Sequence, residues 1–123
     1  MTVDFAHGKF ALHGSLAGPW QVTGGSAKYQ SASQQLATGT VVFTGCLDTN
    51  RSRRCDTGEP KGTLRISYTF LAEFDPATKM FLRGTSIETV TGGTGSFAHA
   101  KGALVFDHHA NGTSAYRGEL ALS

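Results

Sequence analysis

The sequence lacks most of the features that point to a macromolecular partner. Eleven lysines and arginines against nine aspartates and glutamates leave a net charge of only +2, so we expect no nucleic-acid-binding surface. No apolar run approaches the roughly 20 residues that a membrane helix needs, and no charged-then-apolar leader precedes the rest of the chain. We therefore expect a soluble protein without a nucleic-acid or membrane partner.

Helical patterns are missing as well. The best candidate, residues 26–37, is polar almost throughout and has too few apolar residues at spacings of 3, 4 and 7. It holds at most one helical turn. The 123 residues, 39% of them hydrophobic, have room for one core only.

Alternation of apolar and polar residues with period 2 is the dominant pattern. It is clearest over residues 64–70, where Leu64, Ile66, Tyr68 and Phe70 share one face. Glycine, asparagine or aspartate turns separate the segments of this kind. Six strands are predicted, over residues 10–16, 40–46, 64–70, 80–88, 102–107 and 116–122.

The two halves of the chain resemble each other, which predicts an internal pseudo-repeat. Tyr29 and Phe97 occupy similar places after the two Gly-Gly pairs. The matched segments are 10–14 with 80–84, 22–25 with 90–93, and 39–43 with 102–106. Two such halves, with a short strand near each corner, predict an all-β fold: a small closed antiparallel β-barrel of about eight strands, forming a single domain over residues 1–123.

Four glycines gather in the segment from Gly92 to Gly102. A phosphate-binding loop would need a following Lys-Ser/Thr and a long helix, and neither is present. We instead expect these glycines to take positive φ at a barrel corner while Phe97 folds inward as a plug.

The segment Gly92-Gly-Thr-Gly-Ser-Phe97-Ala-His-Ala-Lys-Gly102 resembles the late signature of the allene oxide cyclase and dirigent-like barrels, and the resemblance extends over roughly residues 62–122. It implies an eight-stranded barrel, often trimeric, that holds a hydrophobic substrate and steers its cyclisation or coupling. Allene oxide cyclases place a glutamate from an early strand in the pocket, whereas Asp4 is the only acid in the first 47 residues here. No catalytic residue of the family is therefore carried over.

Cys46 and Cys55 flank a polar loop between two predicted strands. This spacing fits a disulfide across the base of the loop, which would imply a secreted protein whose leader has been removed. The alternative is two free thiols in a reducing, cytoplasmic compartment.

The same loop carries oxygen ligands at the relative positions 1, 3, 5, 9 and 12 of a calcium-binding EF-hand loop. These residues are Asp48, Asn50, Ser52, Asp56 and Glu59. Against a Ca²⁺ site, Arg53 replaces the expected glycine, and Arg51 and Arg54 add positive charge. The alternative is a solvated charged hairpin, whose three arginines could also bind an acidic partner.

Other catalytic constellations are not supported by the sequence. His108 and His109 are adjacent on a predicted strand and point to opposite faces, so they cannot grip one metal ion. No serine-centred nucleophile elbow is present. Apart from possible Ca²⁺, no cofactor is expected.

Three residues are candidates for chemistry inside the barrel. Tyr68 and Tyr116 lie on the apolar faces of their strands, so either phenol could donate to a ligand oxygen. Glu88, near the barrel mouth, could have a raised pKa suited to proton transfer. The alternatives are that each tyrosine only reaches a backbone carbonyl while packing the core, and that Glu88 is exposed.

Four apolar side chains are expected to line the ligand site: Trp20, Phe70, Leu82 and Phe106. Two functions then compete. The first is a non-covalent cyclase or isomerase acting on a small hydrophobic molecule, for which a pocket above about 300 Å³ is expected. The second is a secreted, non-enzymatic binding or structural barrel, stabilised by the disulfide and possibly by Ca²⁺, with a packed interior. The family resemblance adds the expectation of a homotrimer.

Overall fold

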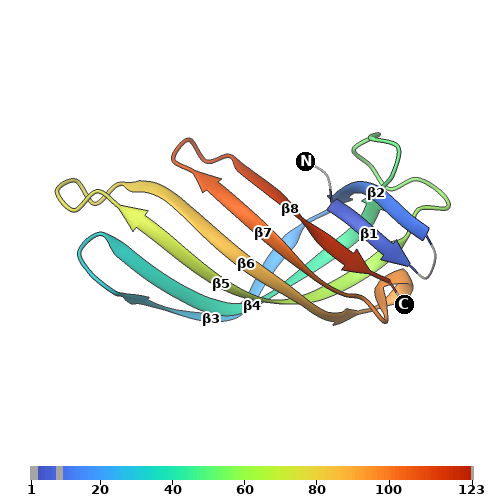
Figure 1. Ribbon diagram of the computed structural model, residues 1–123, viewed down its shortest axis with the longest axis horizontal. Coiled ribbons are helices and arrows are strands. Elements are labelled where there is room, and N and C mark those ends of the chain that lie inside the picture. Colours follow the sequence, from blue (N-terminus) through green and yellow to red (C-terminus); the bar gives the residue numbers. More distant parts are fainter. Residues whose placement is uncertain (1–2, 8–9, 123) are drawn as a thin grey trace.

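The computed structural model describes the backbone of residues 3–7 and 10–122 and the side chains of residues 15–122. Its eight strands form one curled sheet (Figure 1). The strands are β1 Val3–His7, β2 Phe10–Ala17, β3 Trp20–Tyr29, β4 Gln34–Asp48, β5 Lys61–Phe74, β6 Phe81–Gly93, β7 Lys101–His109 and β8 Ser114–Ala121. A single 3₁₀ turn, η1 Gly95–Phe97, interrupts them, and none of the described residues forms a helix long and apolar enough to span a membrane.

The strand order across the sheet is β2-β1-β8-β7-β6-β5-β4-β3. Neighbouring strands are antiparallel, except that β1 runs parallel to β8. The long strand β4 pairs with β3 along most of its length and with β2 at its end. Strands β2 and β3 therefore lie one after the other along the same edge of β4 and together count as one strand in the width of the sheet. The sheet is thus seven strands wide, and the six strands expected from alternation are all present.

The curled sheet is an open half-barrel and not the closed barrel that the repeat predicted. Three residue pairs between β2 and β4, Ser15 to Ala17 with Asp48 to Cys46, join the two sides of the sheet at one end. Beyond this closed end, strand β3 has no second neighbour among the described strands, and β8 is paired with β1 only over Glu119 to Ala121. Strand β2 pairs with β1 up to Gly14 and with β4 from Ser15, and after the break at Gly18-Pro19 the chain continues along β4 as β3.

The predicted pseudo-repeat is wrong at its corners. Gly92 and Gly93 end strand β6 and lead into the 3₁₀ turn, whereas Gly24 and Gly25 lie inside β3, which continues to Tyr29. The aromatic residues also differ, since Phe97 is fully buried and Tyr29 is 65% exposed. The two similar segments therefore have different roles: Gly92 and Gly93 are followed by a turn, whereas Gly24 and Gly25 lie within a strand that continues into a hairpin.

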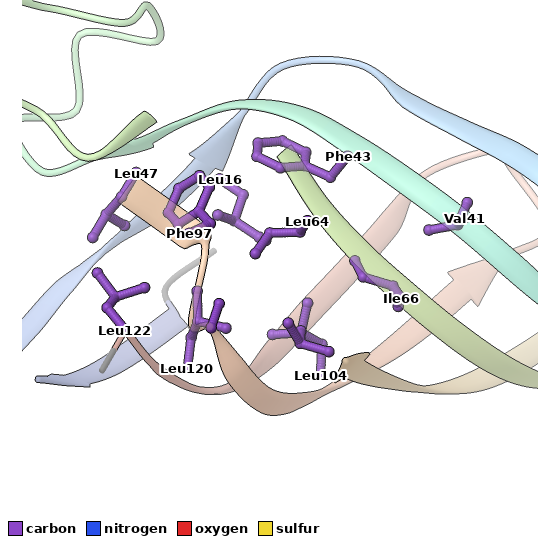
Figure 2. Packing of buried hydrophobic residues seen from close by; sticks show 12 residues of the cluster. Leu16, Val41, Phe43, Leu47, Leu64, Ile66, Phe97, Leu104, Leu120 and Leu122 are labelled. Carbon is purple, nitrogen blue, oxygen red and sulfur yellow. The ribbon is translucent and has the colours of Figure 1, made fainter. Parts of the chain in front are cut away.

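The corner after β6 confirms the expectation in part: Phe97 is buried as a plug, but only Gly92 and Gly95 of the four glycines have a positive φ. Gly95 has a φ of 62°, the left-handed region that favours glycine, and a Cβ on Gly93 would clash with the Thr63 carbonyl oxygen. The tight turn lets Phe97 point back into the core, where Figure 2 shows it beside Leu16, Leu47 and Leu64.

The core fills the closed end of the half-barrel. It contains apolar side chains from β2 and β4 to β8, with Trp20, Tyr68, Phe106 and Tyr116 packed against it. The buried members are Leu16, Val41, Phe43, Leu47, Leu64, Ile66, Val90, Phe97, Ala100, Leu104, Leu120 and Leu122. The packed interior ends where the sheet opens, so a ligand cavity inside the half-barrel has to lie on the concave face beyond it.

Candidate functional site

Strand register places polar residues on the concave face just beyond the core. Tyr68 on β5 lies opposite Glu88 on β6, which lies opposite Leu104 on β7. The next row toward the open end contains Phe70, Ser86, Phe106 and Tyr116, and the row after it contains Gly84 and His108. Side chains alternate between the faces of a strand, so these rows point into the half-barrel together with the core residues.

A cavity of about 210 Å³ lies on this face, and we call it the cup. The side chains around it come from strands β3 to β7. They are Val22, Val41, Tyr68, Phe70, Ser86, Glu88 and His108. The cup is apolar on most sides, but one carboxyl, one imidazole and two hydroxyl groups converge on it, the usual composition of a small-molecule site.

Glu88 is the unusual residue of the cup. Its side chain is only 9% exposed, and its Oε2 atom is buried without any hydrogen-bond partner. Burial raises the pKa of Glu88 to about 7, because the charged form loses water and gains no donor in exchange. The carboxyl is therefore partly protonated near neutral pH and can both give and accept a proton.

His108, which also lines the cup, is held by two serine hydroxyl groups. Its Nδ1 atom is 2.7 Å from the Ser114 hydroxyl and its Nε2 atom 3.3 Å from the Ser86 hydroxyl. The ring is stacked on Phe106 and meets Phe70 edge-on, with centroids 5.9 and 5.1 Å apart. Burial lowers the pKa of His108, so the imidazole is neutral at neutral pH and the cup contains no cationic group.

Tyr68 projects across the concave face toward two glycines. A Cβ added to Gly25 would lie 2.6 Å from the Tyr68 hydroxyl, and one added to Gly39 would lie 2.8 Å from it. The missing side chains make room for the phenol over strands β3 and β4. No group of residues 15–122 forms a hydrogen bond with this hydroxyl, so it is available to a bound molecule.

Tyr116 has a structural position instead. Its hydroxyl accepts a hydrogen bond of 2.8 Å from the Leu16 N–H and reaches the Leu16 carbonyl oxygen at 3.4 Å, which ties β8 to β2 across the interior. Burial raises the pKa of Tyr116, partly offset by the Leu16 backbone bond. This is the alternative that the sequence left open for the tyrosines, and Tyr116 does not line the cup.

The predicted apolar lining is divided between three places. Phe70 lines the cup. Trp20 and Phe106 form an aromatic cluster with Tyr116 next to the cup, with Trp20 5.4 Å from Phe106 and Phe106 4.9 Å from Tyr116 between ring centroids. Leu82 is 44% exposed and does not line the cup.

Sequence reasoning missed Ser86 and His108 as members of the site. A signal for both was present, because Ser86 is two residues before Glu88 on one strand and His108 is two residues after Phe106 on another. Period-2 spacing places each pair on one face.

The loop between β4 and β5 contains the expected Cys46–Cys55 disulfide, with Cα atoms 5.6 Å apart. The side chains of the predicted Ca²⁺ ligands are hydrogen-bonded to backbone N–H groups of the loop and to one another. Asp48 accepts the Ser52 and Arg53 N–H groups, Glu59 accepts those of Thr49 and Asp56, and Asn50, Ser52 and Asp56 are bonded to one another. No three His, Cys, Asp or Glu side chains in the described part of the chain lie close enough to hold a metal.

Fold and site together define an all-β half-barrel with a small apolar cup that contains one buried carboxyl group. Comparisons with models of protein families, with curated proteins and with solved structures gave no match to this chain.

Proposed function

We propose that the protein binds a small apolar molecule in the cup and isomerises or cyclises it without a covalent intermediate, with Glu88 as the acid–base group. The observation that carries the proposal is the buried Oε2 atom of Glu88, which has no partner. An unpaired buried carboxyl costs stability, and such groups concentrate at functional sites. A ligand that exchanges a hydrogen bond or a proton with Glu88 would supply the missing partner.

The chemistry follows from the groups around the cup. The Glu88 carboxylate takes a proton from a carbon next to a ligand carbonyl, while the Tyr68 hydroxyl donates a hydrogen bond to the oxygen that gains charge. Glu88 then returns the same proton to another carbon of the ligand, so the enzyme ends unchanged. His108 is neutral and bonded to two serines, and it forms one wall of the site as a positioning residue.

The volume of the cup limits the ligand. At about 210 Å³ it is smaller than the roughly 300 Å³ at which ligand pockets usually begin, so it fits a single small ring, or one end of a longer molecule that extends through the open side. The resemblance of the segment from Gly92 to Gly102 to the allene oxide cyclase and dirigent-like barrels points in the same direction, toward a hydrophobic substrate and an oligomer such as a trimer.

The second candidate is a secreted binding or structural barrel without catalytic activity. It is favoured by the filled closed end and by the Cys46–Cys55 disulfide, which fits an oxidising compartment. This candidate keeps the cup as a binding site and assigns no proton transfer to Glu88.

A conversion of 3-cyclohexenone to the conjugated 2-cyclohexenone, followed by ultraviolet absorbance, tests the acid–base role. The wild type should accelerate the reaction, and Glu88→Gln should lose about a hundredfold or more of the rate, because the amide has a similar shape but no acid–base function. Glu119→Gln, which changes an exposed glutamate on β8, is the matched control.

Ligand-observed NMR with the same compound separates the two candidates. Binding without turnover would favour the binding barrel, and turnover that survives in Glu88→Gln would exclude Glu88 as the acid–base group. If neither cyclohexenone nor other small apolar rings bind in the cup, the isomerase and the binding barrel are both wrong, and only a structural barrel is left.

A further inference from the structure

A second hollow, of about 600 Å³, lies at the closed end of the half-barrel. It is formed where the loop between β4 and β5 folds beside the end of β2 (Figure 1). The residues around it are Ser15, Leu16, Ala17, Gly18, Asp48, Arg51 and Arg53. None of them lines the cup, so this is a separate place on the molecule.

The acidic residues of the loop are turned toward its own backbone. Asp48 is only 4% exposed, and its two carboxylate oxygens accept the Ser52 and Arg53 N–H groups at 3.1 and 2.8 Å. Glu59, 8% exposed, accepts the Thr49 and Asp56 N–H groups, each at 2.7 Å. Both carboxylates are therefore occupied in holding the loop together and are poorly placed to pair with arginine side chains.

The third acid of the loop is also occupied. Asp56 accepts hydrogen bonds from the Ser52 hydroxyl at 2.6 Å and the Asn50 amide at 2.9 Å, and it pairs with Arg54 at 3.2 Å. The Ser52 bond, followed by the Asn50 bond, lowers the pKa of Asp56, so its carboxylate stays charged. One arginine of the loop is neutralised in this way.

The other two arginines have no such partner. Neither the Arg51 nor the Arg53 guanidinium forms an ion pair or hydrogen bond with the described residues, yet both side chains line the hollow. Their backbones have φ angles of 60° and 64°, and the Asp48 bonds and the disulfide at the base of the loop hold this arrangement. Two arginines with one carboxylate, that of Asp48, leave one net positive charge at the hollow.

We propose that this hollow, which we call the arginine hollow, is a binding site for a ligand that presents an oxyanion, with Arg51 and Arg53 as its direct contacts. A guanidinium group donates paired N–H bonds to two oxygens of a carboxylate, sulfate or phosphate group. The loop presents two such groups without an internal partner to displace.

The experiment is a titration of ¹⁵N-labelled protein, followed through the backbone amides of Ser52 and Arg53 and the Nε–H signals of both arginines. The probes are benzoate, inorganic sulfate and inorganic phosphate, each at constant ionic strength. The wild type should show saturable shifts at these positions. Tighter binding of benzoate indicates a carboxylate ligand, whereas tighter binding of sulfate or phosphate indicates an ester of those acids.

The variant Arg51→Gln/Arg53→Gln should lose at least tenfold in affinity. The control, Arg83→Gln/Arg117→Gln, removes the same two charges from surface pairs with Glu73 and Asp107 and should stay within twofold of the wild type. Equal losses in the two double variants would show that only net charge matters, and shifts that never saturate in the wild type would show that no site exists. Either result overturns the proposal.

A second double variant controls for rearrangement of the loop. Arg51→Lys/Arg53→Lys keeps both charges but removes the planar fork, and we expect an intermediate loss of affinity. A gain of two hydrogens in the variant's mass on reduction, together with unchanged Ser52 amide protection, shows that the loop is still folded. Full affinity in the lysine variant would exclude guanidinium recognition and would also overturn the proposal.

Discussion

Replacing Glu88 by glutamine should make the protein more stable, and by an amount that depends on pH. The pKa of Glu88 is about 7 in the folded protein, against an ordinary value of 4.5. At about 1.36 kcal/mol for each pH unit, this difference is worth about 3 kcal/mol. Solvent at the open side of the cup screens part of it, so we expect about 2 to 3 kcal/mol.

The sign follows from proton binding. Between pH 4.5 and 7 the folded chain keeps the Glu88 proton and the unfolded chain has lost it, so the wild type loses stability as pH rises through this window. Below about pH 4 both states are protonated and the penalty vanishes. Above about pH 8 both are deprotonated, and the penalty is constant at its full value. Glutamine does not titrate and has no such penalty.

Thermal and urea unfolding of the wild type and Glu88→Gln from pH 4 to 8 measure this difference directly. Near pH 4 the two proteins should be alike, and near pH 8 the variant should melt higher by roughly 6 to 15 °C, since about 1 kcal/mol shifts Tm by 3 to 5 °C in a chain of this size. Glu119→Gln controls for the removal of a surface carboxylate. A difference between wild type and Glu88→Gln that is flat from pH 4 to 8 would refute the burial of an unpaired carboxyl group.

Three further changes test other parts of the structure. Tyr116→Phe should cost about 1 to 2 kcal/mol in urea unfolding because the backbone N–H that donates to its hydroxyl is left unpaired, and ligand binding should not change; a loss of binding at full stability would place Tyr116 in the site instead. Replacing Cys46 and Cys55 by alanine should lower the free energy of unfolding by about 2 to 3 kcal/mol. Reduction of the wild type should add the mass of two hydrogens, and a wild type whose mass does not change on reduction would contradict the disulfide. Calcium against chelator should leave Tm unchanged, because the loop carboxylates are already hydrogen-bonded, and a rise of several degrees with calcium would contradict that network.

The sequence predicted the faces of the strands better than the curvature of the sheet. Alternation around Tyr68 and Phe70 fixes which side chains share a face, and both line the cup. Closure depends instead on where β2 leaves β1 and joins β4, which is decided over a few residues next to Gly18 and by tertiary pairing. The alternation of residues along a strand does not determine which strands pair at the edges of the sheet. For this reason a closed barrel was expected, whereas one end of the sheet is open.

The candidate site was predictable in part for the same reason. Glu88 was expected near the barrel mouth, but its lack of a partner depends on side chains from other strands that period and spacing do not reveal. The loop shows the opposite case. Its ligand-like spacing is real in the sequence, yet the carboxylates of Asp48 and Glu59 bond to nearby backbone N–H groups, because local donors are closer than an ion would be.

The parallel pairing of β1 with β8 has a consequence for how the chain folds. Strands β3 to β8 form a meander in which each strand pairs with the next, so short loop closures suffice to assemble the cup. The β1–β8 ladder joins Asp4 to Glu119, nearly the whole length of the chain apart. Its closure entropy has to be overcome before its bonds are gained, so we expect the two chain ends to dock last and slowest in refolding. Pulsed hydrogen exchange during refolding would show the amides of β1 protected after those of β5 and β6.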